Sequence, residues 1–169
     1  MSERDYNKIG SELWLSPRFR GLSEAGKTAF LYIMTNRHVP SIGCYYLPEG
    51  YACTDLEWPA EKYAGVRDEL IAAGLIDYDP DAEEVFIERW VKHNPLTNSK
   101  HATGAFKRIE HLRSDKIREK ALAAFTADKE RMDEQLRQKE AQKAMRSSTF
   151  AAQDQTRAYL LSSRLMNRG

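Results

Sequence analysis

The order of helix, strand and turn signals between residues 22 and 91 constrains the fold of this chain more than any other feature of its sequence. The segments expected there are, in order, an apolar helix opening at residues 22–27, a strand at 43–47, a second helix at about 51–57, a third helix at 60–73, and strands at 75–79 and 84–91 joined by a turn at 80–82. Gly74 supports the end of the third helix, because glycine readily adopts the positive φ required just past a helix end. This order is typical of a winged helix-turn-helix domain, so the sequence predicts a mainly α protein with a small β-wing.

Composition divides the rest of the chain into parts. We expect an N-terminal arm at residues 1–21, the winged helix-turn-helix domain at 22–91, a basic helical extension at 92–146 and a C-terminal tail at 147–169. Pro17 and Gly21 are expected to prevent a helix in the arm. The last helix of the extension is expected to be capped by Ser114 and to break at residues 147–149. The tail is either irregular or a short amphipathic helix that binds a partner through an apolar face, which would include Tyr159, Leu161 and Leu165.

Charge is distributed unevenly along the chain, whose overall net charge is +1. Residues 1–90 contain 9 Lys/Arg and 16 Asp/Glu, a net charge of −7, whereas residues 91–169 contain 17 Lys/Arg and 9 Asp/Glu, a net charge of +8. A polyanion would therefore be bound mainly by the second half. An equally weighted interpretation is that the two halves attract each other, within one chain or between subunits.

The sequence contains no recognisable motif for catalysis or metal binding. The spacings between the four histidines are 55, 8 and 10 residues, none of which is the i, i+4 spacing of a helical metal site, and Cys44 and Cys53 lack C-x-x-C spacing. Phosphate-binding glycine loops and nucleophile elbows are also missing, so we expect no enzyme activity, no cofactor and no metal. The longest apolar run, residues 29–34, is too short to span a membrane, and the first residues lack the apolar core of a secretory signal, which favours a cytoplasmic protein.

Binding to DNA has a physical route in this sequence, because phosphate contacts by clustered Lys and Arg supply most non-specific affinity. In the third helix, the residues able to enter or flank the major groove are Lys62, Tyr63 and Arg67. Three acidic residues lie beside them in the same helix and would repel phosphate. Phosphate contacts are therefore expected mainly from basic residues outside this helix, namely Arg18, Arg20, Lys92, Lys100, Lys107 and Arg108. Four more cations, Arg113, Lys116, Arg118 and Lys120, extend the same basic surface.

Distinctive short phrases occur between residues 8 and 125, namely Trp14, Phe19, LSEAGK at 22–27, FLYIMT at 30–35, IG at 42–43, LIAAGLIDYD at 70–79 and VKHNP at 91–95. In combination they resemble a family of phage and prophage winged-helix proteins related to replication initiators and replisome organisers. The resemblance implies an N-terminal domain that binds double-stranded origin DNA, a C-terminal part that recruits a helicase or helicase loader, and no catalytic residues. The acidic third helix departs from this pattern and favours a protein-binding surface there.

Two other functions stay open at this point. The chain could be an adaptor or inhibitor that binds another protein through its acidic winged-helix surface. It could also be a transcriptional regulator, which would bind a palindrome as a dimer because a lone recognition helix rarely gives enough specificity. The sequence does not decide whether the protein forms a homodimer.

Overall fold

The computed structural model describes residue 7 and residues 9–166, with side chains described up to residue 146. The chain divides into two compact units, the first ending at Lys129 and the second beginning at Glu130.

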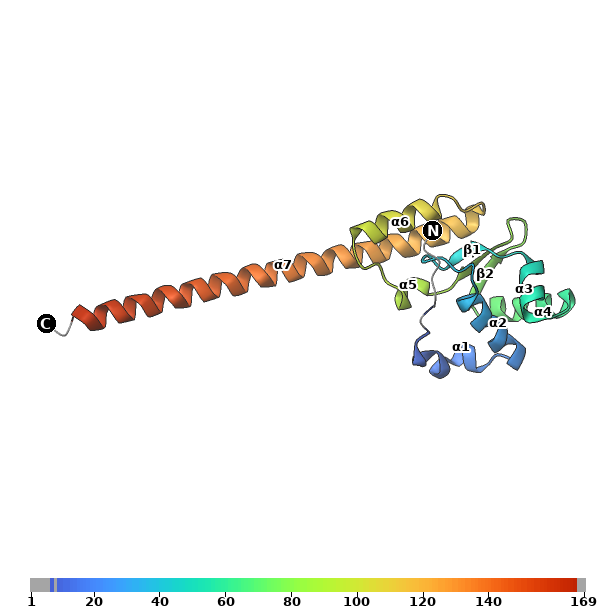
Figure 1. Cartoon of the computed structure of the whole chain (residues 1–169), viewed down its shortest axis with the longest axis horizontal. Helices are drawn as coiled ribbons and strands as arrows, with labels where there is room; N and C mark the ends of the chain where they lie inside the picture. Colours follow the sequence, from blue (N-terminus) through green and yellow to red (C-terminus); the bar gives the residue numbers. More distant parts are fainter. Residues whose placement is uncertain (1–6, 8, 167–169) are drawn as a thin grey trace. The chain divides into compact units, whose positions relative to one another are not determined.

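The elements of the first unit are, in order, the 3-10 helix η1 (Ser11–Leu15), α1 (Pro17–Arg20), α2 (Glu24–Thr35), β1 (Cys44–Tyr46), α3 (Glu49–Leu56), α4 (Ala60–Ala72), β2 (Ile76–Asp79), β3 (Glu84–Ile87), α5 (Trp90–His93), α6 (Ser99–Ile109) and the beginning of α7 (Asp115–Met166) (Figure 1). The described part of the chain is mainly helical and contains a small three-stranded antiparallel sheet, which confirms the predicted mainly α class. The helices and strands expected between residues 22 and 79 are present, with small differences in their ends. Gly74 has a φ of +64°, as expected just past the end of α4.

The sheet has the strand order β1-β3-β2, so β3 is its central strand. Phe86 of β3 lies between Cys44 of β1 and Asp77 of β2. All four residues of β3 are buried. The reason is that helices cover both faces of the sheet, with α2, α3 and α4 on one side and α6 and the first turns of α7 on the other (Figure 1). Both faces of this strand therefore carry contacts.

One part of the apolar core lies between the sheet and helix α2, and another is formed by buried residues of α6 and α7. Ala29, Phe30 and Ile33 of α2 are buried, as their spacing predicts, while Met34 is half-buried. Tyr45 is also buried, and its hydroxyl donates to the carbonyl oxygen of Ile33 over 2.7 Å. Satisfying this buried hydroxyl avoids the desolvation cost of an unpaired polar group.

The strand expected to reach Val91 ends at Ile87 instead, and this prediction was wrong. Arg89 adopts a left-handed φ of 60°, which turns the chain out of the sheet, and Trp90 begins the short helix α5. The indole N–H of Trp90 donates to the carbonyl oxygen of Ser41 over 2.8 Å. This tertiary hydrogen bond fixes the ring beside the loop that precedes β1.

Two predicted helix breaks are also wrong. Pro17 begins helix α1 rather than preventing a helix, because its fixed φ suits the first position of a helix, where no amide hydrogen is needed. Helix α7 runs without interruption through residues 147–149. The Ser and Thr residues there cost about 0.5 kcal/mol each relative to alanine in a helix interior, which is too little to end a helix.

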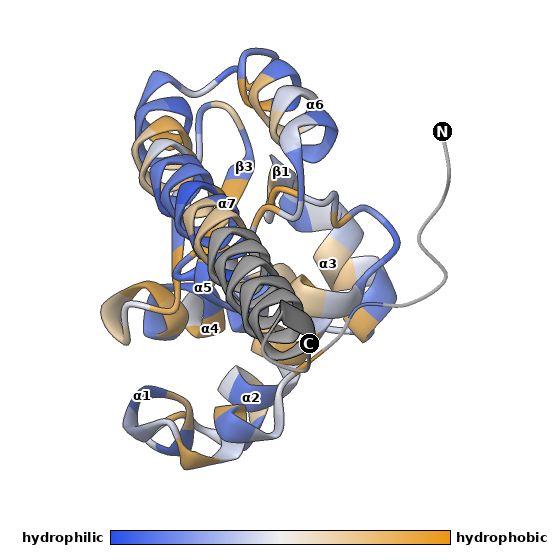
Figure 2. Cartoon of the chain, turned by 90° about the vertical axis from the view of Figure 1, so that its left-hand side faces the viewer, coloured by the Kyte–Doolittle hydropathy of each residue, from blue (hydrophilic) through white to orange (hydrophobic). Residues whose placement is uncertain are grey.

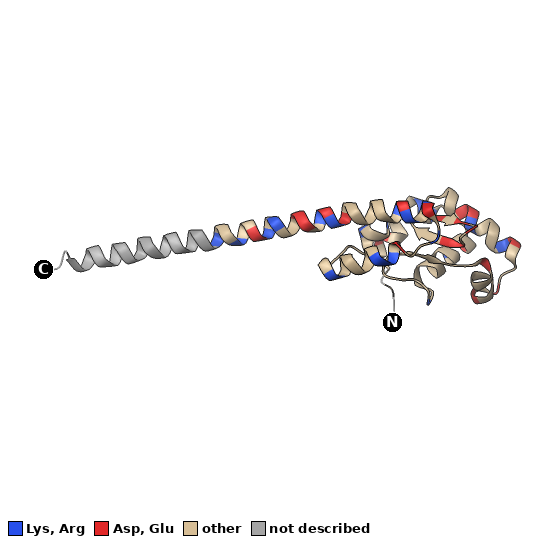
Figure 3. Ribbon diagram, turned by 90° about the horizontal axis from the view of Figure 1, so that it is seen from above, with Lys and Arg blue, Asp and Glu red and all other residues tan. Residues whose placement is uncertain are grey.

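The second unit consists of the rest of helix α7. Its side chains from Glu134 to Arg146 are all exposed, and acidic and basic residues are interspersed along this stretch (Figure 3). Leu136 and Met145 are among them, exposed by 45% and 73%. Within residues 9–166, no helix combines the length and the apolar character that crossing a membrane requires.

Candidate nucleic-acid interface

Helix α4 is the third helix of the predicted domain, and its buried face contains two of the residues predicted to contact DNA. Tyr63 is 1% exposed, and burial raises its pKa, so its hydroxyl cannot reach a DNA groove and its assignment to the groove is corrected. The side chain of Arg67 is 16% exposed, with its Nη1 atom 3.0 Å from Oε2 of Glu49. Its guanidinium carbon also lies 4.7 Å from the ring centroid of Tyr78. Both residues therefore hold the fold together.

The exposed face of α4 is acidic. Glu61 and Asp68 are exposed there, as is Lys62, whose Nζ atom lies 4.0 Å from the ring centroid of Trp58. Glu69 is half-buried and accepts hydrogen bonds of 2.7 Å from the main-chain and hydroxyl groups of Ser23 at the start of α2. Of the three candidates in this helix, Lys62 alone is available to a ligand.

The predicted phosphate-binding residues of the arm and of α5 are exposed but differ in their contacts. Arg18 donates from Nη1 to the carbonyl oxygen of Gly74 over 2.9 Å, which ties the arm to the end of α4. Arg20 at the end of α1 and Lys92 in α5 are exposed and form no ion pair with any described residue. Arg18 and Arg20 belong to α1 and Lys92 belongs to α5, so these cations come from two separate elements.

Helix α6 is amphipathic and presents the remaining predicted cations. Asn98 caps it by accepting a 2.8 Å hydrogen bond from the main-chain N–H of His101. The buried side of α6 consists of alanine and isoleucine, so the helix carries both apolar and strongly polar residues (Figure 2). Lys100, Lys107 and Arg108 are exposed, and none of them pairs with a carboxylate in the part of the chain described.

A groove of about 630 Å³ lies between α6 and strand β1. Its floor includes Ile42 and Cys44, and burial raises the pKa of the Cys44 thiol to about 12. Its rim is basic and aromatic, with side chains that include Lys107, Arg108, His111, Arg113 and Tyr46. Of these five, Lys107, Arg108 and Arg113 belong to the basic surface that the sequence predicts. His111 and Arg113 lie in the connection between α6 and α7, and Tyr46 lies in the edge strand β1, so no spacing rule brings these residues together.

The acidic side chains on the α7 face of the sheet bind the beginning of that helix. Glu84 is 3% exposed, and its two carboxylate oxygens accept the main-chain N–H groups of Arg113 and Ser114, each over 2.9 Å. The hydroxyl of Ser114 accepts the N–H of Ile117 over 3.1 Å, which confirms Ser114 as the cap of α7, and donates to Asp79 over 2.5 Å. Carboxylates at a helix N-terminus are also favoured by the helix dipole.

Two lysines of α7 complete this attachment. Lys116 and Lys120 lie 2.6 and 2.8 Å from the carboxylate oxygens of Asp77, and Lys120 lies 2.5 Å from Glu88. Burial opposes the charged form of Asp77, but these hydrogen bonds outweigh it and lower its pKa. The two halves of the chain therefore attract each other within the first unit, as one interpretation of the charge division predicted.

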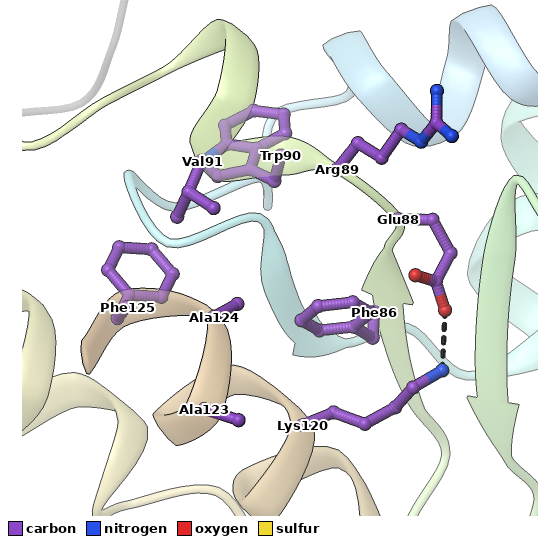
Figure 4. A pocket seen from close by; sticks show the side chains of 9 residues that line it. All are labelled: Phe86, Glu88, Arg89, Trp90, Val91, Lys120, Ala123, Ala124 and Phe125. Atoms are coloured by element: carbon purple, nitrogen blue, oxygen red, sulfur yellow. Dashed lines mark hydrogen bonds and ion pairs between the residues drawn. The ribbon is translucent and has the colours of Figure 1, made fainter. Parts of the chain in front are cut away.

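A second hollow, of about 220 Å³, lies between β3, α5 and α7 (Figure 4). Its walls are mainly apolar and include Phe86, Trp90 and Phe125, while the ion pair between Glu88 and Lys120 closes one side. A third charged residue, Arg89, also lines this hollow and is exposed.

The residues predicted to bind a partner through the tail, Tyr159, Leu161 and Leu165, fall on the helical backbone of α7, and their side chains lie outside the described residues. Cys44 and Cys53 are free thiols. Among the side chains described, no group of three or more His, Cys, Asp or Glu residues is arranged to hold a metal ion.

Comparisons of the chain with protein-family models, curated proteins and solved structures found no match.

Proposed function

We propose that this chain is a winged-helix DNA-binding protein of the replication-initiator type found in phages and prophages. The element order from α2 through β3 and the strand order β1-β3-β2 support a winged helix, in which the β2–β3 hairpin is the wing. The sequence phrases that resemble replication initiators support the functional class, and a helicase or helicase loader is the proposed partner of the C-terminal region.

The observation that carries the proposal is the set of exposed cations on α6, which have no carboxylate partner among the described residues. Lys100, Lys107 and Arg108 have no ion pair with a described carboxylate that would have to be broken before a phosphate binds. Desolvation of each cation is therefore the only free-energy cost that its own surroundings impose on such a contact. The exposed face of helix α4 is instead acidic, and Lys62 is the one candidate cation available on it. We therefore place the DNA backbone against α6 and not against α4.

A charge reversal of two α6 residues tests this placement. The variant Lys107→Glu/Arg108→Glu should weaken duplex binding for all sequences alike, because phosphate contacts carry no sequence information. For two lost phosphate contacts, the slope of log K against log salt concentration should fall by about 1.8 in magnitude. The matched control is Lys139→Glu/Lys143→Glu, which changes the net charge equally at exposed positions of α7.

Fluorescence anisotropy with a duplex across a salt series measures both variants. Reduced affinity and a shallower slope for the α6 variant, with the control close to wild type, support the proposal. Equal behaviour of the two variants would remove α6 from the interface.

A second function, a protein-binding adaptor, is favoured by the exposed acids on α4. Glu61 and Asp68 could pair with a basic protein surface, and the C-terminal part of α7 could add an apolar contact. A pull-down of a phage or host partner without nucleic acid, lost on truncation after residue 146, would favour this function over DNA binding.

A further inference from the structure

Three exposed aromatic side chains lie in contact at one end of the groove between β1 and α6. The ring centroids of His38 and Tyr51 are 5.1 Å apart with an interplanar angle of 29°, a stacked arrangement. Those of Tyr51 and Tyr46 are 6.3 Å apart and nearly perpendicular. Tyr46 and Tyr51 are exposed by 43% and 46%. We call His38, Tyr46 and Tyr51 the aromatic cluster.

The aromatic cluster is continuous with the basic rim of the groove. The guanidinium carbon of Arg113 lies 5.6 Å from the ring centroid of Tyr46, and both residues line the groove together with Lys107 and Arg108. A row of flat groups therefore runs from the loop before β1 to the cations of α6. His111 stands in the same rim, with its Nδ1 atom 2.6 Å from the carbonyl oxygen of Lys107.

The acidic residues beside this row are already engaged. Glu83 accepts a 3.0 Å hydrogen bond from the hydroxyl of Tyr46, which fixes that ring on the rim. Glu84 is buried and accepts the main-chain N–H groups at the start of α7. Neither carboxylate neutralises the cations of α6, so the groove keeps a basic character next to its exposed rings.

We propose that this groove binds single-stranded nucleic acid, with unpaired bases stacked on the aromatic cluster and the sugar-phosphate backbone held by Lys107, Arg108 and Arg113. The inference rests on the proposed DNA-binding function and names the form of DNA that this groove takes. Proteins that bind single strands combine a cationic groove with aromatic rings, because every base has a face that can stack. In a duplex the base faces are hidden, so exposed rings would add nothing to duplex binding.

An acidic peptide is the other ligand that a basic groove could take. It would use the cations but would gain little from the exposed aromatic rings. The pairing of exposed rings with unpaired cations therefore favours bases joined by phosphates over carboxylates.

The test compares an oligonucleotide of about 15 thymidines with an abasic oligonucleotide of equal length and charge, using fluorescence anisotropy. The wild-type chain should bind the thymidine strand at least about fivefold more tightly, since stacking requires bases. Tyr51→Ala should reduce affinity for the thymidine strand to a similar degree and leave affinity for the abasic strand unchanged. Tyr51→Phe, which keeps the ring, should bind like wild type. Trp14→Ala is the control for an exposed aromatic residue outside the groove.

The outcomes separate this inference from the proposed function. If the chain binds neither duplex nor single strand, both fail. If it binds duplex through Lys107 and Arg108 but does not distinguish thymidine from abasic strands, the inference alone is overturned. Competition by polyglutamate as strong as that by the thymidine strand also overturns it, in favour of a protein ligand. A ribo-oligonucleotide that binds more tightly than its deoxy counterpart supports the groove and assigns RNA as its ligand.

Discussion

Gly43 and Gly74 share a left-handed backbone conformation but differ in their surroundings, and this difference predicts unequal effects of the same substitution. Both have a φ of +64°. A Cβ atom on Gly43 would lie 2.2 Å from Cδ2 of Trp90, whereas one on Gly74 would come no closer than 3.5 Å to Nη1 of Arg18. Alanine in this conformation costs about 1–2 kcal/mol at either position. At Gly43 the clash with the indole adds about 1–3 kcal/mol of overpacking strain.

We therefore expect Gly74→Ala to lower the free energy of unfolding by about 1–2 kcal/mol and Gly43→Ala by about 2–5 kcal/mol. Urea titration followed by tryptophan fluorescence is the suitable assay, because Trp14, Trp58 and Trp90 all lie in the first unit. In a Trp90→Ala background, Gly43→Ala should cost no more than Gly74→Ala, since the clashing atoms of Trp90, which begin at Cγ, are gone. If Gly43→Ala and Gly74→Ala had equal effects in the wild-type background, the reasoning from the indole contact would be refuted.

Two further predictions concern the attachment of α7 to the sheet. The pKa of Asp77 is lowered on folding because hydrogen bonds from Lys116 and Lys120 outweigh burial, so its contribution to stability is present above its ordinary pKa of 3.8 and is lost as the pH falls through the folded-state value. Urea midpoints of Asp77→Asn and wild type, measured from pH 7 into acid, should differ at pH 7 and converge at the acid end; a constant difference would contradict this origin. Glu84→Gln replaces one accepting oxygen with a donor that faces a main-chain N–H, and should cost about 1–3 kcal/mol. Glu61→Gln on the exposed face of α4 is the control and should change the free energy of unfolding by less than about 0.5 kcal/mol; equal effects would show that the buried hydrogen bonds contribute little.

The elements of the fold were largely predictable because local signals and periodicity agree there. Ser23 caps α2 by accepting from the N–H of Gly26 over 2.9 Å, and Gly74 ends α4, both as their residue types favour. The end of β3 was not predictable, because the left-handed turn at Arg89 accompanies the hydrogen bond between the indole N–H of Trp90 and the carbonyl oxygen of Ser41. Such a contact joins residues far apart in sequence and leaves no local pattern.

The candidate site was predictable only in part, for a related reason. The spacing of α6 predicts that Lys107 and Arg108 face solvent, and they do. The spacing of α4 places Tyr63 on the apolar stripe of the helix, so a role in the core was as compatible with the sequence as a contact with DNA. The structure buries Tyr63, because a tyrosine contributes a large apolar area to a core. Tyr46 and Tyr51 joined no predicted site, because their proximity depends on how β1 and α3 pack together.

The division of charge along the chain has two physical roles, and the structure separates the residues that serve them. Asp77 of β2 and Glu88, which follows β3, form ion pairs with Lys116 and Lys120. These two lysines therefore attach α7 to the sheet. The cations of α6 have no such partners among the described residues. α6 joins α7 through a connection of a few residues, in which the main-chain N–H groups of Arg113 and Ser114 donate to Glu84. A third acid of the sheet therefore holds α6 beside strand β1. Weakening the attachment by Glu84→Gln should therefore loosen the wall of the groove and reduce binding of a thymidine strand, even though Glu84 carries the same sign of charge as the ligand. A gain in affinity from this loss of negative charge would show instead that simple repulsion, and not the placement of α6, governs the groove.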